Sequence, residues 1–147
     1  MSSGEANFGS WDTHEKNAES LKAFLMPMMD ESFSALLEDL QVRGLLDETL
    51  VLWYGEFGRT PRHNSNAGRD HWGSVFALAL VGGGIRGGVV HGASDWIAAY
   101  PKDGLVRPQD LIATIFHCLG IHPDTEIRDI VGRPVPVSRG QVIRQIL

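Results

Sequence analysis

Cysteine is nearly absent from the sequence, and so are long apolar runs and any excess of positive charge. The one cysteine, Cys118, cannot form an internal disulfide, and its apolar neighbours at 115–119 indicate a small buried residue rather than a nucleophile. No apolar run approaches the ~20 residues that cross a bilayer. A formal net charge of -5 gives no reason to expect a nucleic-acid partner. The remaining class is a globular domain, since 147 residues suit one domain.

The N-terminus, MSSGEANFGSWDTHEKN, lacks the basic and apolar regions of a signal peptide. We therefore expect either a cytoplasmic protein or a chain whose true beginning is missing. Residues 1–10 are small and polar and predict a flexible loop. Residues 136–147 predict a C-terminal tail after the last element. Residues 1–147 together are expected to form a single domain.

Apolar spacing predicts helices alternating with buried strands. A helical stripe begins at Leu21 and ends at Gly44, and Pro27 within it should kink the helix or mark the start of its regular part. Residues 49–54 and 74–84 are apolar on both faces, as central strands are. A second helix is predicted in RPQDLIATIFHCLGI. This order predicts an α/β fold, a sheet with helices on both faces, in which ligands sit beyond the strand ends.

Acids and histidines gather where such a site would lie. The candidate metal ligands are Asp12, His14, Glu56, Asp70 and His71, because carboxylate oxygen and imidazole nitrogen bind zinc, manganese and similar ions. In an extended segment, residues two apart point the same way about 6.6 Å from each other along the chain. Asp12 and His14 can therefore reach one ion.

Each candidate also has an ordinary structural interpretation. Asp12 can cap the following helix, with Glu15 in the capping-box position. Residues 56–59 can be a polar turn with an Arg–Glu pair, and Asp70 can simply orient His71. One ligand cluster would explain all three patterns at once.

Two arginines near these acids suit an oxyanion. Arg59 and Arg69 are natural partners of phosphate or sulfate, although a structural salt bridge is an equal alternative for Arg69. Gly55 and Gly58 flank the acid at the strand end and permit a sharp turn. His91 is a weaker candidate for a further ligand.

The sequence offers no catalytic nucleophile. No G-x-S-x-G elbow is present, and GGGIRGG lacks the G-K-[ST] of a phosphate-binding P-loop.

Several stretches together resemble a bacterial family, domain of unknown function 1501, which is described as sulfatase-like and placed with the alkaline phosphatase superfamily. The resemblance covers roughly residues 9–135, and its most specific part is GEFGRTP with GRDHW. The stretches are WDTHEKN, LLDETLVLWYGEFGRTP, GRDHW, ALVGGGIRGG and DLIATIFHCLGI.

The resemblance implies roles for single residues. Gly55–Gly58 match a metal-binding S/A-D-H-G, so that Glu56 replaces the aspartate and Phe57 stands where a ligand histidine is usual. A full two-metal site is therefore in question. His71 matches a ligand histidine that precedes a strand, with Asp70 as its orienter or as a further ligand.

The same resemblance covers both ends of the chain. Asp12 and His14 match a D-x(n)-H ligand pair, with shorter spacing than usual. Ala113 replaces the common proline of the closing helix.

The implied function is metal-assisted hydrolysis of a small-molecule or polysaccharide phosphate or sulfate ester, with one or two zinc, manganese or calcium ions. Family members place the nucleophile and a first metal-binding aspartate in an N-terminal half, so this chain resembles only about the C-terminal third. We therefore expect it to be inactive alone. Export to the periplasm is implied for a full-length protein.

Two alternatives remain. The first is a non-catalytic module with a vestigial metal site that binds a polysaccharide or a protein. The second is a metal-binding scaffold that needs its N-terminal half. A truncated sheet should also expose apolar surface, which predicts a homodimer or poor solubility.

Overall fold

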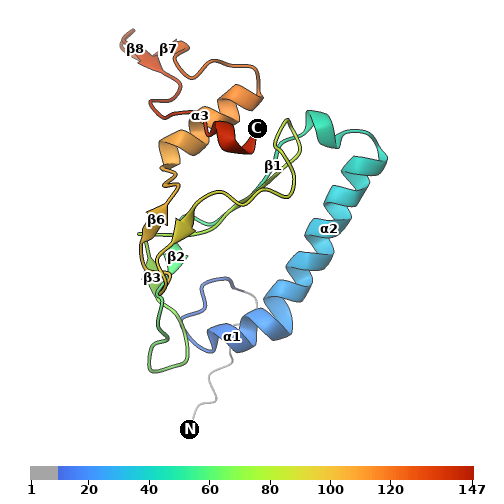
Figure 1. Cartoon of the computed structure of the whole chain (residues 1–147), viewed down its shortest axis with the longest axis vertical. Coiled ribbons are helices and arrows are strands. Elements are labelled where there is room, and N and C mark those ends of the chain that lie inside the picture. Colours follow the sequence, from blue (N-terminus) through green and yellow to red (C-terminus); the bar gives the residue numbers. More distant parts are fainter. Residues whose placement is uncertain (1–9) are drawn as a thin grey trace.

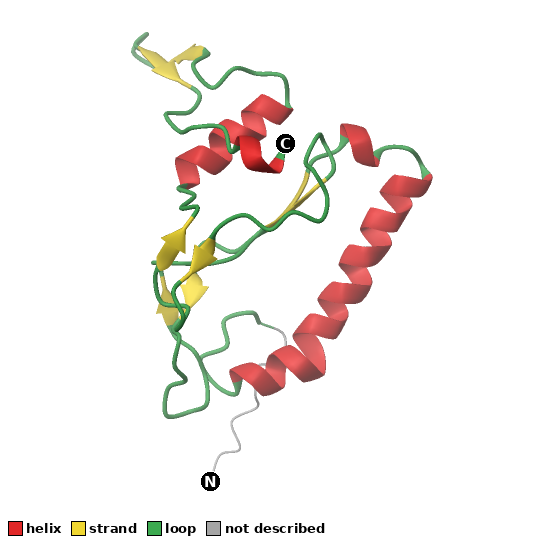
Figure 2. Ribbon diagram, viewed as in Figure 1, coloured by secondary structure: helices red, strands yellow, loops and turns green. Residues whose placement is uncertain are grey.

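The computed structural model describes residues 10–147. Most of the loop predicted for residues 1–10 therefore lies outside the described residues. The described part is a mixed α/β structure in which helices flank short two-stranded ladders (Figures 1 and 2).

A long N-terminal helical segment occupies one side of the molecule, as the apolar stripe predicts (Figure 1). It consists of α1, Asn17–Ser20, a π-helical stretch, Leu21–Leu25, and α2, Met26–Val42. Pro27 lies in the first turn of α2 and marks the start of the regular helix, because proline has no N–H to donate to the preceding turn. Gly44 follows the helix with a φ of 68°. No helix in residues 10–147 combines the length and the apolar character needed to span a bilayer.

The two predicted strands pair with each other. β1, Val51–Trp53, and β4, Ala79–Val81, form an antiparallel ladder that is shorter than the predicted segments 49–54 and 74–84. The other antiparallel ladders join β2, Gly58–Arg59, to β3, His71–Trp72; β5, Ala93–Ser94, to β6, Pro101–Asp103; and β7, Glu126–Arg128, to β8, Pro134–Pro136.

This pairing differs from the predicted sheet with helices on both faces. Residues 10–147 form four separate two-stranded ladders, and β1 is only half-buried. An apolar run indicates that a segment can form a buried strand. Whether that strand is buried depends on the segments that pack against it in the fold. Here β1 has β4 on one side and no strand of the described chain on the other.

The second predicted helix and the C-terminal residues pack together. α3, Pro108–Cys118, begins with a capping box in which Asp110 accepts a hydrogen bond from the Arg107 backbone N–H at 2.9 Å. The predicted tail then returns along α3, since the Ile143 backbone N–H donates to the buried Thr114 hydroxyl at 3.0 Å. It ends in a 3₁₀ turn, Arg144–Ile146; another such turn, Leu46–Glu48, precedes β1.

Much apolar surface stays open to solvent. The chain exposes 10723 Å², whereas a compact monomer of 16.1 kDa exposes about 7,400 Å². None of the residues of α2 is buried, and its main packing is with the segments directly before and after it. Leu36 on α2 is 47% exposed. The exposed apolar surface was expected of a truncated sheet, whereas the homodimer or poor solubility that it predicts stays a prediction.

Candidate metal centre

The segment before α1 places two polar side chains on one side. Thr13 is buried, and its hydroxyl accepts a hydrogen bond from the Asn17 side-chain amide at 2.6 Å. On either side of it Asp12 is exposed and His14 is half-buried, and Asp12 Oδ1 lies 3.1 Å from His14 Nε2. The side chains of Asp12 and His14 therefore meet, although the segment is a turn rather than extended.

The loop between β2 and β3 lies against this segment. The Arg69 backbone N–H donates to the Thr13 carbonyl at 3.1 Å, and the Asn17 N–H donates to the Ala67 carbonyl at 2.9 Å. Gly68 permits the approach, because a Cβ there would lie 1.8 Å from the His14 carbonyl oxygen. Two segments fifty or more residues apart in sequence are thus held together by backbone contacts.

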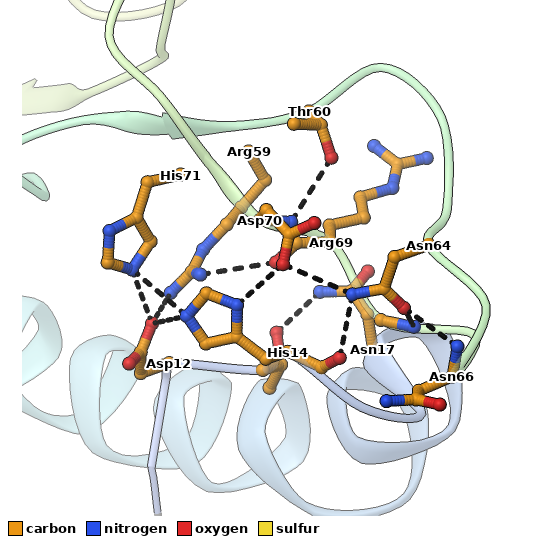
Figure 3. Close-up of polar contacts among 12 residues, drawn as sticks. Asp12, His14, Asn17, Arg59, Thr60, Asn64, Asn66, Arg69, Asp70 and His71 are labelled. Atoms are coloured by element: carbon orange, nitrogen blue, oxygen red, sulfur yellow. Dashed lines mark hydrogen bonds and ion pairs between the residues drawn. The ribbon is translucent and has the colours of Figure 1, made fainter.

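The β2–β3 hairpin supplies the third polar side chain. Arg59 and His71 are directly paired across the ladder. His71 is the first residue of β3. Because the hairpin is tied to the N-terminal segment through its loop, His71 faces Asp12 and His14 (Figure 3).

Three potential ligand atoms converge in this place (Figure 3). Asp12 Oδ1 lies 2.7 Å from His71 Nε2 and 3.1 Å from His14 Nε2, and the two Nε2 atoms are 3.2 Å apart. The three side chains are between 42% and 53% exposed, so solvent and ions have access. We call Asp12, His14 and His71 the triad.

Asp70 orients His14 rather than His71. Its carboxylate accepts a hydrogen bond from His14 Nδ1 at 2.7 Å, which leaves His14 Nε2 with a free lone pair when the ring is neutral. Asn64 holds this arrangement, since its side-chain amide donates to Asp70 at 3.1 Å and to the His14 carbonyl at 2.9 Å. The bond from His14, followed by that from Asn64, lowers the pKa of Asp70. A carboxylate that fixes a ligand histidine in this way is a common feature of metal sites.

The triad geometry fits a small divalent ion. Ligand atoms about 2.0–2.2 Å from a tetrahedral ion lie roughly 3.4 Å apart. The separations in the triad, 2.7, 3.1 and 3.2 Å, need to widen by roughly 0.2–0.7 Å to reach this value. Two imidazole nitrogens and one carboxylate oxygen are ligand atoms that divalent transition metals accept, whereas calcium prefers oxygen ligands.

Arg59 pairs with a member of the triad. Its Nη2 lies 2.7 Å from Asp12 Oδ1 and also donates to the Trp11 carbonyl at 2.9 Å. The hydrogen bond from His71, followed by that from Arg59, lowers the pKa of Asp12 to about 2. Asp12 is therefore ionised at neutral pH and carries the negative charge that a cation needs.

Phe57 supports the triad without being a ligand. Its ring packs on the His71 ring with centroids 4.1 Å apart, and the Arg59 guanidinium lies 5.9 Å from the Phe57 centroid. The aromatic residue that stands where a ligand histidine was expected thus limits how the His71 ring can turn.

The remaining predicted residues are placed outside the triad. Glu56 lines an open hollow beside it, together with Asp12 and His71, but is not one of the converging ligands. Arg69 contributes its carbonyl to Arg59 at 3.2 Å, while its own Nε is buried without a hydrogen-bond partner among the described residues. His91 is not part of the triad either.

The ordinary interpretations of these motifs do not describe the structure. α1 begins at Asn17 after Lys16, with no side-chain cap, so Asp12 is not a helix cap. Arg59 pairs with Asp12 and not with Glu56.

Sequence reasoning missed the organising role of Asn64. Its side-chain oxygen accepts from the backbone N–H groups of Asn66 and Gly68 at 3.0 and 2.9 Å. Asparagine ahead of a glycine-containing turn is the signal for this local pattern. No local pattern around His14 predicts that its carbonyl accepts a hydrogen bond from Asn64.

The comparisons with known proteins give a family and nothing closer. No curated protein and no solved structure matches the chain. The family model described as "Protein of unknown function (DUF1501)" matches residues 5–147. This match spans nearly the whole chain and every residue of the triad, and the chain therefore belongs to the DUF1501 family.

Proposed function

We propose that the chain is the metal-binding part of a hydrolase that cleaves phosphate or sulfate esters. The observation that carries the proposal is the convergence of Asp12 Oδ1, His14 Nε2 and His71 Nε2 within 3.2 Å of one another. The resemblance to sulfatase-like proteins of the alkaline phosphatase superfamily supports the same chemistry, and the short ladders would belong to the larger sheet of such a fold.

The triad residues would hold one zinc or manganese ion, and Asp70 would orient His14. A divalent ion there would act as a Lewis acid and lower the pKa of bound water from 15.7 to about 7. Arg59 lies at the same carboxylate and would turn toward the oxyanion of the ester once that carboxylate is shared. Phe57 would keep the His71 ring in place.

The chemistry also needs a nucleophile, which the sequence motifs do not supply. We infer that a partner completes the site, either the N-terminal half of a longer protein or a second copy of the chain. The isolated chain would then bind metal without turning over an ester.

Metal content by elemental mass spectrometry tests the proposal. The wild-type chain, soaked in zinc or manganese and desalted, should retain close to one equivalent, and His71→Ala should lose it. His117→Ala is the matched control, since His117 is exposed on α3 and lies outside the triad.

Two results would contradict the proposal. One is wild-type chain free of metal after soaking. The other is equal metal loss in His71→Ala and His117→Ala, which would show unspecific histidine binding. Either result would favour the alternative of a non-catalytic module with a vestigial site.

A further inference from the structure

The open hollow beside the triad has an aromatic wall. Its volume is about 690 Å³, and Asp12, His71 and Arg59 form part of its lining. Small-molecule sites usually measure about 300–1,000 Å³. The aromatic side chains in the lining are Trp11, Trp53, Tyr54 and Phe57.

These rings are open to solvent although they are large and apolar. Trp11 is 43% exposed, Trp53 37% and Tyr54 62%. Trp11 and Trp53 meet edge to face, with centroids 6.2 Å apart and planes at 69°. This contact packs the two indoles against each other, so an approaching ligand meets an aromatic wall that the free chain already forms.

We propose that this hollow is a subsite for the ring of the ester, a phenyl or sugar ring with an apolar face, while the anionic group lies at the triad and Arg59. The inference rests on the proposed function and adds its substrate class. Charge and shape agree, because the Arg59 guanidinium, paired with Asp12, lines the hollow and would turn to the anionic group once a metal ion shares that carboxylate, while the indoles offer flat apolar surface to the ring. Glu56 lines the same hollow and is available to ring hydroxyls.

A second hollow, of about 440 Å³ at the end of α3, offers no such combination. Its lining includes His117 and Arg144 but no aromatic side chain apart from histidine, and it lies away from the triad. The aromatic hollow is therefore the better candidate for ring recognition.

Tryptophan fluorescence measures the subsite directly, because two of the four tryptophans line it. The manganese-loaded chain is titrated with phenyl phosphate, glucose 6-phosphate and methyl phosphate. At least one of the two ring esters should bind about tenfold more tightly than methyl phosphate, the size of a good aromatic contact. Trp53→Ala should abolish this preference and leave manganese binding unchanged. Trp96→Ala is the control, since Trp96 is 94% exposed and outside the hollow.

The phenyl and glucose esters distinguish the two kinds of ring. Equal binding of all three esters, or a preference that survives Trp53→Ala, would overturn the subsite while leaving the metal proposal intact. The same titrations on metal-free chain test the ring subsite independently of metal binding at the triad. A ring preference without manganese would uphold the subsite even if the triad binds no metal.

Discussion

Replacing Asp70 tests whether the triad is an organised metal centre. The Asp70 side chain bonds to the triad at His14 Nδ1, at 2.7 Å, and supplies none of the three converging ligand atoms, so Asp70→Asn leaves all three in place. Loss of a carboxylate behind a ligand histidine costs about 10–100-fold in metal affinity. The Asp70 side chain is 52% exposed, and solvent screening favours the lower end of this range. We therefore expect zinc to bind about tenfold more weakly to Asp70→Asn.

Competition with a fluorescent zinc chelator gives the dissociation constants. Asp129→Asn is the matched control, because Asp129 also bonds a basic side chain, Arg133 at 2.7 Å, far from the triad in sequence. Wild-type affinity in Asp70→Asn would refute the orienting role. A loss as large as in His71→Ala would instead make Asp70 a ligand.

Three further outcomes are expected. Gly68→Ala should lower the melting temperature in a thermal scan and weaken zinc binding in the chelator competition, because a Cβ there would lie 1.8 Å from the His14 carbonyl oxygen. Gly73→Ala is the control, because a Cβ at residue 73 would have no atom within 4 Å, and it should change neither quantity. The pKa of Asp12 falls from 3.8 to about 2 on folding. The contribution of its ionised carboxylate to the free energy of unfolding is therefore fully present above pH 3.8 and is lost as the pH falls toward 2. The melting temperature of the wild-type chain should therefore fall further between pH 4 and pH 2 than that of Asp12→Asn. Equal falls would contradict the stabilising role of the hydrogen bonds from His71 and Arg59 to Asp12. The open face of α2 should make the chain self-associate, and a monodisperse monomer in light scattering would contradict this.

The helices could be predicted from sequence because their signals are local. Apolar spacing, Pro27 and Gly44 located the N-terminal helix, and the apolar stretch around Cys118 with its closing glycine located α3. The strand segments were recognised, but the broad sheet was not found in the described residues. Strand pairing depends on which segments lie side by side in the fold, and an apolar run does not identify those segments.

The candidate site could be predicted only in part, for the same reason. Residue type and spacing brought forward Asp12, His14 and His71. The choice of Asp70 for His14, and of Arg59 for Asp12, depends on contacts between segments that lie 56 and 47 residues apart in sequence. Glu56 had the right chemistry and the right place in sequence, yet it lines the hollow rather than joining the ligands.

The large exposed surface also determines how the chain melts. The heat capacity of unfolding and the denaturant sensitivity both grow with the area that unfolding newly exposes. A chain that already exposes 10723 Å² has less left to expose than its length suggests. Its heat-capacity change should fall below the roughly 1.8–2.2 kcal/mol/K typical of 147 residues. The thermal unfolding transition should therefore be broad. α2 should unfold before the triad and the β2–β3 loop, which backbone hydrogen bonds join to the segment that carries Asp12 and His14.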